Sequence, residues 1–415
     1  MSTLRGVTIT EGKIGNNVSG ESREFGLIGG GVAIVGTGKA TLATAYKLLR
    51  PSDAVALGID AAYDTANDVR VYRHIAEFYR MAGEGKALHL MLVDKADTPL
   101  EMIENAKALV LESGAISDIA FMFNPEAAYV ETLVDGLNAD VKLAIPALQT
   151  FADWCDTHDM PLHTILEGRG IGDTLSALAD LRDLTVGEAA LSAHKVTLVC
   201  GQDWTYADGI TSALGKKFAD VGTFLGCIAA QAWNRNPGEV ATQNLTNSTL
   251  GSWLVGGLSN HKKYTEVYES LETMNAKGYV FPIKYTGLSG YWWNDGHTCA
   301  PIVMDADGNM NQHTIYYSHT MDMAKRALRL AYLPEVKKPV ELDAGKLPSG
   351  MVGYYNALGN EIFKFFAGKG LISDGETSTD ANSDLLVEKV LNVQFGVIPT
   401  GCVNEIKGTI NLKSN

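Results

Sequence analysis

Apolar and polar residues alternate in two short stretches near the end of the chain. Residues 391–397 carry an apolar side chain at every second position, and a turn cluster around Pro399 and Gly401 follows them. The alternation then resumes, and a period of two is typical of a half-buried β-strand. The second stretch consists of Ile406, Lys407, Gly408, Thr409, Ile410, Asn411 and Leu412. We therefore predict two strands here, with almost nothing after the second.

The start of the chain has a similar pattern. Gly6, Val7, Thr8 and Ile9 form a short alternating stretch, and glycine and asparagine residues break the pattern soon after it. A short strand next to a flexible segment leaves backbone N–H and C=O groups unpaired, and such edges can pair with another chain. We predict extended arms at both ends, whose strand edges are either covered or blunted within the subunit or paired with a neighbouring subunit.

Strand and helix patterns alternate between about residue 30 and residue 235. Short apolar runs predict buried strands, and apolar positions at helical spacing predict amphipathic helices. The predicted strands cover residues 32–35, 88–93, 119–123, 162–166 and 196–200, and the predicted helices cover 68–81, 98–111, 126–137 and 151–158. This order predicts the α/β fold class, with layered domains and a mixed, largely parallel sheet.

Three polar residues follow predicted strands, where open α/β sheets usually bind ligands. They are Asp94, Asn124 and Asp203. Short polar side chains also cap helices and turns at such places. We favour capping, because no convergent set of partner residues is visible in the sequence.

The glycine-rich loop from Gly36 to Lys39 suggests a nucleotide site and leaves that alternative open. A phosphate-binding P-loop needs GxxxxGK followed by Ser or Thr. Here Ala33 stands at the first glycine position and Ala40 follows the lysine. The dinucleotide fingerprint fails as well, because Thr41 replaces its third glycine. A strand-to-loop turn explains the stretch better, and an α/β nucleotide-binding enzyme stays the alternative.

The last third of the chain predicts further elements. Helices are expected over residues 210–233, 264–274, 313–333 and 351–369, and a polar linker of the disordered type over 374–383. The aromatic cluster at residues 291–293 predicts packing at a domain or subunit interface. Residues 305–309 resemble a calcium loop in part, but a tight hairpin turn explains Asp307 and Gly308 more simply.

Composition narrows the classes of function. The 34 Lys and Arg residues against 48 Asp and Glu give a net charge of −14, which disfavours nucleic acid as a partner. The five cysteines are scattered and form no CxxC pair, which predicts reduced thiols without a metal site. No apolar run approaches the roughly 20 residues of a membrane helix, and no secretory signal is visible. We predict a cytosolic protein that is not an enzyme and has neither a cofactor nor a membrane-inserted segment.

The order of these features resembles the contractile tail sheath family of phages and related injection machines. The resemblance rests on Gly6 to Ile9, on residues 32–38, 49–53 and 57–58, and on the closing stretch from 292 to 412. Ser318 and His319 stand near the place where the family often carries paired arginines. The resemblance implies four parts. These are an N-terminal strand-exchange arm (1–24), an α/β body (25–285), a closing module (286–383) and a C-terminal strand-exchange arm (384–415).

The resemblance also implies the partners. Such proteins form hexameric rings that stack into a helical tube around an inner tail tube, together with baseplate and tail terminator proteins. The tube shortens and drives the inner tube through a membrane. By analogy, Lys364 and Lys369 face the inner tube. The protein would be part of a virion tail or an injection particle, assembled in the bacterial cytoplasm. A different homopolymer, such as a surface-layer protein, is a further alternative.

Overall fold

The body of the molecule is built on a six-stranded sheet. The computed structural model describes residues 23–413, and the sheet has the strand order β10-β7-β4-β1-β3-β2. Neighbouring strands are parallel except for β2, which runs antiparallel to β3. The strands are β1 (Glu24–Gly31), β2 (Ala45–Leu48), β3 (Leu88–Asp94), β4 (Ile116–Met122), β7 (His163–Glu167) and β10 (Val196–Val199). The predicted α/β class with a mixed sheet is confirmed.

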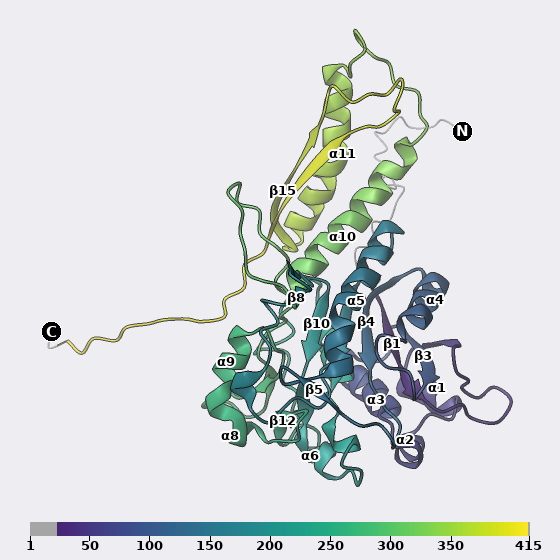
Figure 1. The fold of residues 1–415 in the computed structure, drawn as a ribbon. Coiled ribbons are helices and arrows are strands. Elements are labelled where there is room, and N and C mark those ends of the chain that lie inside the picture. Colours follow the sequence, from purple (N-terminus) through teal and green to yellow (C-terminus); the bar gives the residue numbers. More distant parts are fainter. Residues whose placement is uncertain (1–22, 414–415) are drawn as a thin grey trace, which may run out of the picture.

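Helices cover both faces of this sheet (Figure 1). Alternation along β1 sends Leu27 into the core shared with α3 (Val71–Ala82) and α7 (Val221–Ala230), and Ile28 into the opposite core. That opposite core contains α4 (Ile103–Ser113) and α5 (Ala139–Thr157). Period-two side-chain alternation in a strand covered on both sides explains why β1, β3 and β4 are almost fully buried.

The first strand lies earlier than the sequence predicts. Residues 32–35 belong to a loop in which Val35 is 99% exposed, and the strand is the glycine-rich Glu24–Gly31. A Cβ on Gly29 would lie 2.1 Å from Cγ of Met122 and 2.2 Å from its carbonyl oxygen. The glycines thus allow β1 and β4 to pack closely, a property that strand propensity does not reveal.

Several helix predictions change in the structure. Residues 126–137 form turns and the hairpin of β5 (Leu133–Val134) and β6 (Leu137–Asn138). The Asn138 side chain caps α5, so the helix begins only after this hairpin. Helix α4 begins at Ile103, and only Val221–Ala230 of the predicted 210–233 helix is α-helical. The other short elements of the body are α1 (Pro51–Ala56), α2 (Ala61–Asn67), β8 (Thr185–Val186), β9 (Ala189–Ala190), β11 (Gly201–Asp203), α6 (Trp204–Asp208), β12 (Gly256–Leu258), α8 (Tyr264–Val267), α9 (Leu271–Ala276), β13 (Pro282–Ile283) and β14 (Trp292–Trp293).

A second unit stands on the body like a stalk (Figure 1). It contains α10 (Ile315–Tyr332), α11 (Ser349–Gly368), β15 (Ile372–Thr379) and β16 (Val393–Pro399), which share a hydrophobic cluster. The predicted disordered linker at 374–383 is wrong, because β15 pairs antiparallel with β16 from Thr379–Val393 to Ile372–Pro399. The buried face of β15 carries glycine and threonine residues, and Gly375 lies against the Phe363 ring. The sequence of β15 therefore lacks the alternation of apolar and polar residues from which a strand is predicted.

Candidate assembly site

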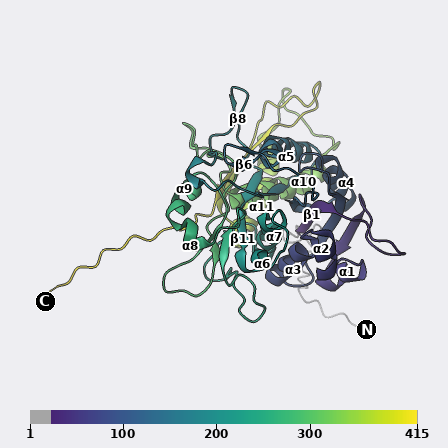
Figure 2. The same ribbon diagram turned by 60° about the horizontal axis from the view of Figure 1, so that its bottom comes forward.

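The chain leaves the rest of the molecule after β16. Residues 401–413 have no secondary structure, and both ribbon views show the end of this segment running away from the body (Figures 1 and 2). Ile406, Ile410 and Leu412 are 88%, 98% and 103% exposed, so the predicted apolar face finds no cover among residues 23–413. Strand exchange by residues 406–412 therefore stays a prediction. The matching residues Gly6, Val7, Thr8 and Ile9 lie outside the described residues.

The two-stranded sheet of the stalk has open edges. Within the described chain, β15 and β16 pair only with each other, and Phe395 and Ile398 on β16 are 40% and 58% exposed. The predicted strand over residues 391–397 is thus confirmed, but it is paired within its own chain. An unpaired sheet edge presents backbone donors and acceptors to which another strand can add.

Helix α10 docks the stalk on the amino ends of three body strands. The His319 ring lies 2.5 Å from Asp118 of β4, and Asp322 forms an ion pair with Lys195, directly before β10. One turn further, Arg326 donates to the carbonyl oxygens of Ile116 and Pro161 at 2.9 and 2.6 Å. These contacts are buried or half-buried. The helix is therefore fixed by charged groups at the edge opposite to the one where α/β sheets usually bind ligands.

Asp118 is the electrostatic centre of this junction. Burial alone would raise the pKa of its carboxyl group, but the charge of His319, its hydrogen bond and the charge of Arg23 lower the pKa below its usual range. Arg23 lies 3.9 Å from Asp118 and also donates to the carbonyl oxygen of Ile228 at 2.8 Å. The first described residue, the stalk and the sheet thus meet at one carboxylate. Sequence reasoning missed this set, although it noted His319 in place of an arginine.

Lys364 lies on the exposed side of α11, and Lys369, which is also exposed, follows the last residue of this helix. The Lys369 ammonium is 5.9 Å from the centre of the Phe365 ring, which is 44% exposed. The structure therefore leaves both lysines open to a partner on the outer surface of the stalk. Their contact with an inner tube stays a prediction.

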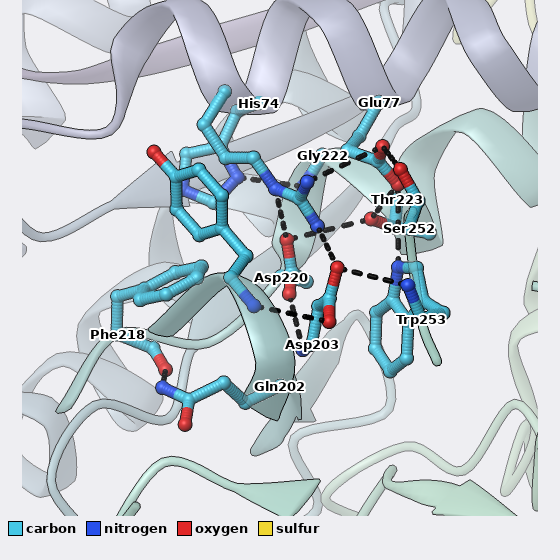
Figure 3. A network of polar contacts seen from close by, with 12 residues as sticks. His74, Glu77, Gln202, Asp203, Phe218, Asp220, Gly222, Thr223, Ser252 and Trp253 are labelled. Carbon is cyan, nitrogen blue, oxygen red and sulfur yellow. Dashed lines mark hydrogen bonds and ion pairs between the residues drawn. The ribbon is translucent and has the colours of Figure 1, made fainter. Parts of the chain in front are cut away.

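Inside the body, a cluster of charged residues surrounds Arg73 of α3. The carboxylates of Asp203, Asp220 and Glu77 converge there (Figure 3), and Arg73 lies 3.1, 3.2 and 3.4 Å from them. The sequence predicts that Asp203 is a cap, and it does cap α6 by accepting from the Tyr206 N–H. Asp203 also meets a convergent set of charged partners, which is not visible in the sequence.

This cluster braces the body and has no free acid–base pair. Burial opposes ionisation of Glu77, but Arg73 and Arg80 outweigh it and lower the pKa of Glu77 to about 2. Burial raises the pKa of Asp220 to about 6. Asp203 also accepts from the Trp253 N–H, and Asp220 from the Asp203 N–H (Figure 3). Buried charges are tolerated when they are paired and hydrogen-bonded in this way.

The nucleotide alternative finds no support in the loop geometry. Gly36 to Gly38 are exposed, Lys39 donates to the carbonyl oxygen of Ala56 at 2.9 Å, and β2 follows the loop instead of a helix. At the carboxyl end of β1, Asn124 donates to the Gly30 carbonyl and accepts from the Arg70 N–H. The Asn124 side chain is therefore engaged in structural hydrogen bonds at the end of β1. The Asp94 side chain accepts from the Ala96 N–H within its own turn.

The remaining motifs have structural explanations. Trp293 is fully buried against Phe224 and Trp253, and the Asp305 N–H donates to the Asn309 carbonyl in a hairpin turn, as predicted. Among residues 23–413 no group of three His, Cys, Asp or Glu residues could hold a metal ion. In the same part of the chain, no helix is long and apolar enough to cross a membrane.

Comparisons with known proteins agree with this architecture. The family model described as DUF2586, N-terminal domain, matches residues 6–297. No curated protein matches the chain in sequence. In the cryo-EM structure of the 6-fold symmetrised baseplate of the anti-feeding prophage (AFP), one chain superposes with a TM-score of 0.61 at 11% identity, covering 100% of both chains.

Two sheath structures are similar as well. The contracted helical sheath of AFP superposes with a TM-score of 0.57 at 11% identity, covering 99% of each chain. The crystal structure of the sheath tail protein from Desulfitobacterium hafniense superposes with a TM-score of 0.51 at 11% identity, covering 95% of this chain and 100% of the other. The fold is therefore that of contractile tail sheath proteins, as the resemblance predicts.

Proposed function

This chain belongs to the DUF2586 family, and we propose that it is a structural subunit of a contractile tail sheath that polymerises around an inner tube. The observation that carries the proposal is the segment after β16. Three large aliphatic side chains alternate along it with no cover, on a chain whose fold is that of sheath proteins. An extended segment of this kind is completed when it joins the sheet of a neighbouring copy.

The open edges of β15 and β16 are the acceptor for such a segment. In this arrangement residues 406–412 of one copy extend the stalk sheet of the next, and residues 6–9 do the same from the other end. Strand addition contributes many backbone hydrogen bonds at once, and alternate side chains enter pockets that set the register. Copies linked in this way close into hexameric rings, and the rings stack helically.

We propose a separate role for each part of the chain. The body (25–285) forms the outer part, the module from 286 carries Lys364 and Lys369 toward the inner tube, and baseplate and terminator proteins end the polymer. The particle is a virion tail or a related injection device, assembled in the bacterial cytoplasm. Contraction converts a metastable extended lattice into a shorter one, without nucleotide.

Deletion of residues 403–415 tests the proposal. We expect a soluble, folded subunit that forms no tubes under conditions in which the full chain does, measured by negative-stain microscopy. A matched pair of point variants sharpens this test. Ile410→Asp places a charge on the apolar face of the segment and should abolish tubes, whereas Asn411→Asp places the same charge on the other face and should not.

Two outcomes contradict the proposal. Tubes at full yield from the deletion variant would show that the segment does not join the copies. Saturable binding of ATP or NAD to the intact subunit, lost when Lys39 is replaced by Ala, would favour the nucleotide-binding alternative.

A further inference from the structure

The last part of the chain is held to the body before it becomes free. Residues 400–404 form a strap that crosses the junction of body and stalk. Asn234 donates to Oγ1 of Thr400 at 3.1 Å and to the carbonyl oxygen of Gly370 at 3.0 Å. Asn404 donates to Oδ2 of Asp295 at 2.8 Å. A pocket of about 830 Å³ lies beside the strap, which forms part of its wall.

Asp295 is prepared to receive the strap. Its side chain is buried, and Oδ1 already accepts from the Asn236 side chain and from the Gly296 N–H, each at 2.7 Å. Within the described chain, the hydrogen bond to Oδ2 of Asp295 comes from the Asn404 side chain. A buried carboxylate oxygen without a donor is costly, and hydrogen bonds to charged groups are among the stronger ones in proteins. Asp295 therefore holds Asn404 by a charge-assisted bond.

Beyond Asn404 this support ends. Residues 405–413 are exposed and make no backbone hydrogen bonds with the rest of the described chain. We infer that the Asn404–Asp295 bond is a latch that fixes where, and in which direction, the C-terminal arm leaves its own subunit. The inference rests on the proposed function, since a fixed direction matters only if the arm has to reach a neighbour. A fixed origin lowers the conformational entropy that the arm loses on docking.

The thiol of Cys402 reports on this latch without engineering. Cys402 is the exposed cysteine in the described chain, whereas Cys155, Cys200, Cys227 and Cys299 are buried. Its sulfur donates to Oδ1 of Asn404 at 3.1 Å, and burial at the strap raises the pKa of the thiol. The strap covers part of this thiol, so its release increases both the access to the sulfur and the thiolate fraction, which together set the reactivity of Cys402.

The test measures the labelling rate of Cys402 with a maleimide at pH 7. We expect the folded wild type to react more slowly than the urea-unfolded chain. Rates are compared as rate constants of the thiolate, obtained from the pH dependence of labelling, because the carboxylate of Asn404→Asp also lies beside the Cys402 thiol. Asn404→Asp places a second carboxylate against Asp295 and should raise this rate constant roughly tenfold, the change that follows from losing one charge-assisted bond. Asn411→Asp, the same change outside the strap, should leave the rate unchanged.

Exchanging the two side chains provides the rescue. In the double variant Asp295→Asn with Asn404→Asp, the new amide at 295 keeps its oxygen for Asn236 and Gly296 and donates its N–H to the new carboxylate. The labelling rate should return to near the wild-type value. A rate in Asn404→Asp equal to the wild-type rate, or no recovery in the double variant, overturns the inference.

Assembly is measured on the same proteins. We expect the protein concentration needed for tube formation to rise roughly tenfold in Asn404→Asp and to recover in the double variant, in line with the opening of the latch. If the labelling rate responds but the wild type forms no tubes, the proposed function fails and the latch stands. If Asn404→Asp labels fast yet forms tubes at the wild-type concentration, the latch does not position the arm.

Discussion

Acidification should weaken the packing of α3 against α7 through one histidine. The His74 side chain is fully buried, and its Nδ1 accepts a hydrogen bond from the Gly222 N–H at 3.2 Å (Figure 3). A protonated ring could not accept that bond. Burial, followed by the charges of Arg73 and Arg70, lowers the pKa of His74 to about 3. The folded state therefore keeps this ring neutral at a pH where the unfolded chain protonates it.

The size of the change in unfolding free energy follows from the linkage between protonation and unfolding. A histidine whose pKa is depressed on folding contributes stability that is present above the unfolded pKa of about 6.5 and is lost as the pH falls toward the folded value. Between pH 7.5 and pH 5.0 the unfolded chain gains almost one proton at this site and the folded chain gains almost none. The loss is roughly 1.5 pH units at about 1.36 kcal/mol each, or about 2 kcal/mol of unfolding free energy.

The assay compares urea unfolding, followed by tryptophan fluorescence, at the two pH values. His74→Asn keeps an acceptor near the Gly222 N–H but does not titrate in this range. On acidification we expect the unfolding free energy of the wild type to fall by about 2 kcal/mol more than that of His74→Asn. Any cavity that the smaller side chain leaves costs the same at both pH values and cancels in this comparison. His158→Asn, the same substitution at an exposed position, provides the control. An equal loss in wild type and His74→Asn would refute the reasoning.

Two further pairs of substitutions test the packing of α7 and the junction of body and stalk. A Cβ on Gly222 would lie 2.4 Å from the backbone oxygen of His74, so Gly222→Ala should destabilise the body by roughly 1–3 kcal/mol in thermal unfolding. Gly353→Ala, which meets no atom within 4 Å on α11, should stabilise by about 0.5–1 kcal/mol, and an equal effect of both would contradict the packing argument. Asp118→Asn removes the charge at the stalk junction and should cost about 3 kcal/mol and speed hydrogen exchange in α10. The exposed Asp307→Asn is its control, and unchanged exchange in Asp118→Asn would count against the junction.

The regular elements could be predicted from the sequence because their signals are local. Strands β3 and β10 are short, mostly apolar runs, and the ends of α10 and α11 lie within two residues of their predicted bounds. The signal fails where the environment of a strand is unusual. In β1 the close approach of β4 requires glycine, and in β15 the inward face beneath Phe363 is small and polar. Sequence analysis therefore places the first buried strand at residues 32–35, after β1, and predicts a linker at 374–383.

The candidate site could be predicted only in part. The exposed alternation at residues 406–412 is a local pattern and is visible in the sequence alone. The partners at the junctions are not, because Asp118 and His319 are 201 residues apart and Asp295 and Asn404 are 109 apart. The same holds for Arg73 and its carboxylates. Spacing along the chain carries no information about such pairs, and only the topology of the sheet brings them together.

The docking of α10 has a mechanical consequence. In its first half, His319 pairs with Asp118 and Asp322 pairs with Lys195. Further along, Lys325 pairs with Asp156 at 2.5 Å and Arg329 with Asp159 at 2.8 Å. A helix tied to the body at several points along its length behaves as a strut and not as a hinge. Force applied to one end of a copy is transmitted through it without bending. In the proposed sheath, shortening would then come from sliding and rotation between whole molecules, and the C-terminal segments would take up the change in distance.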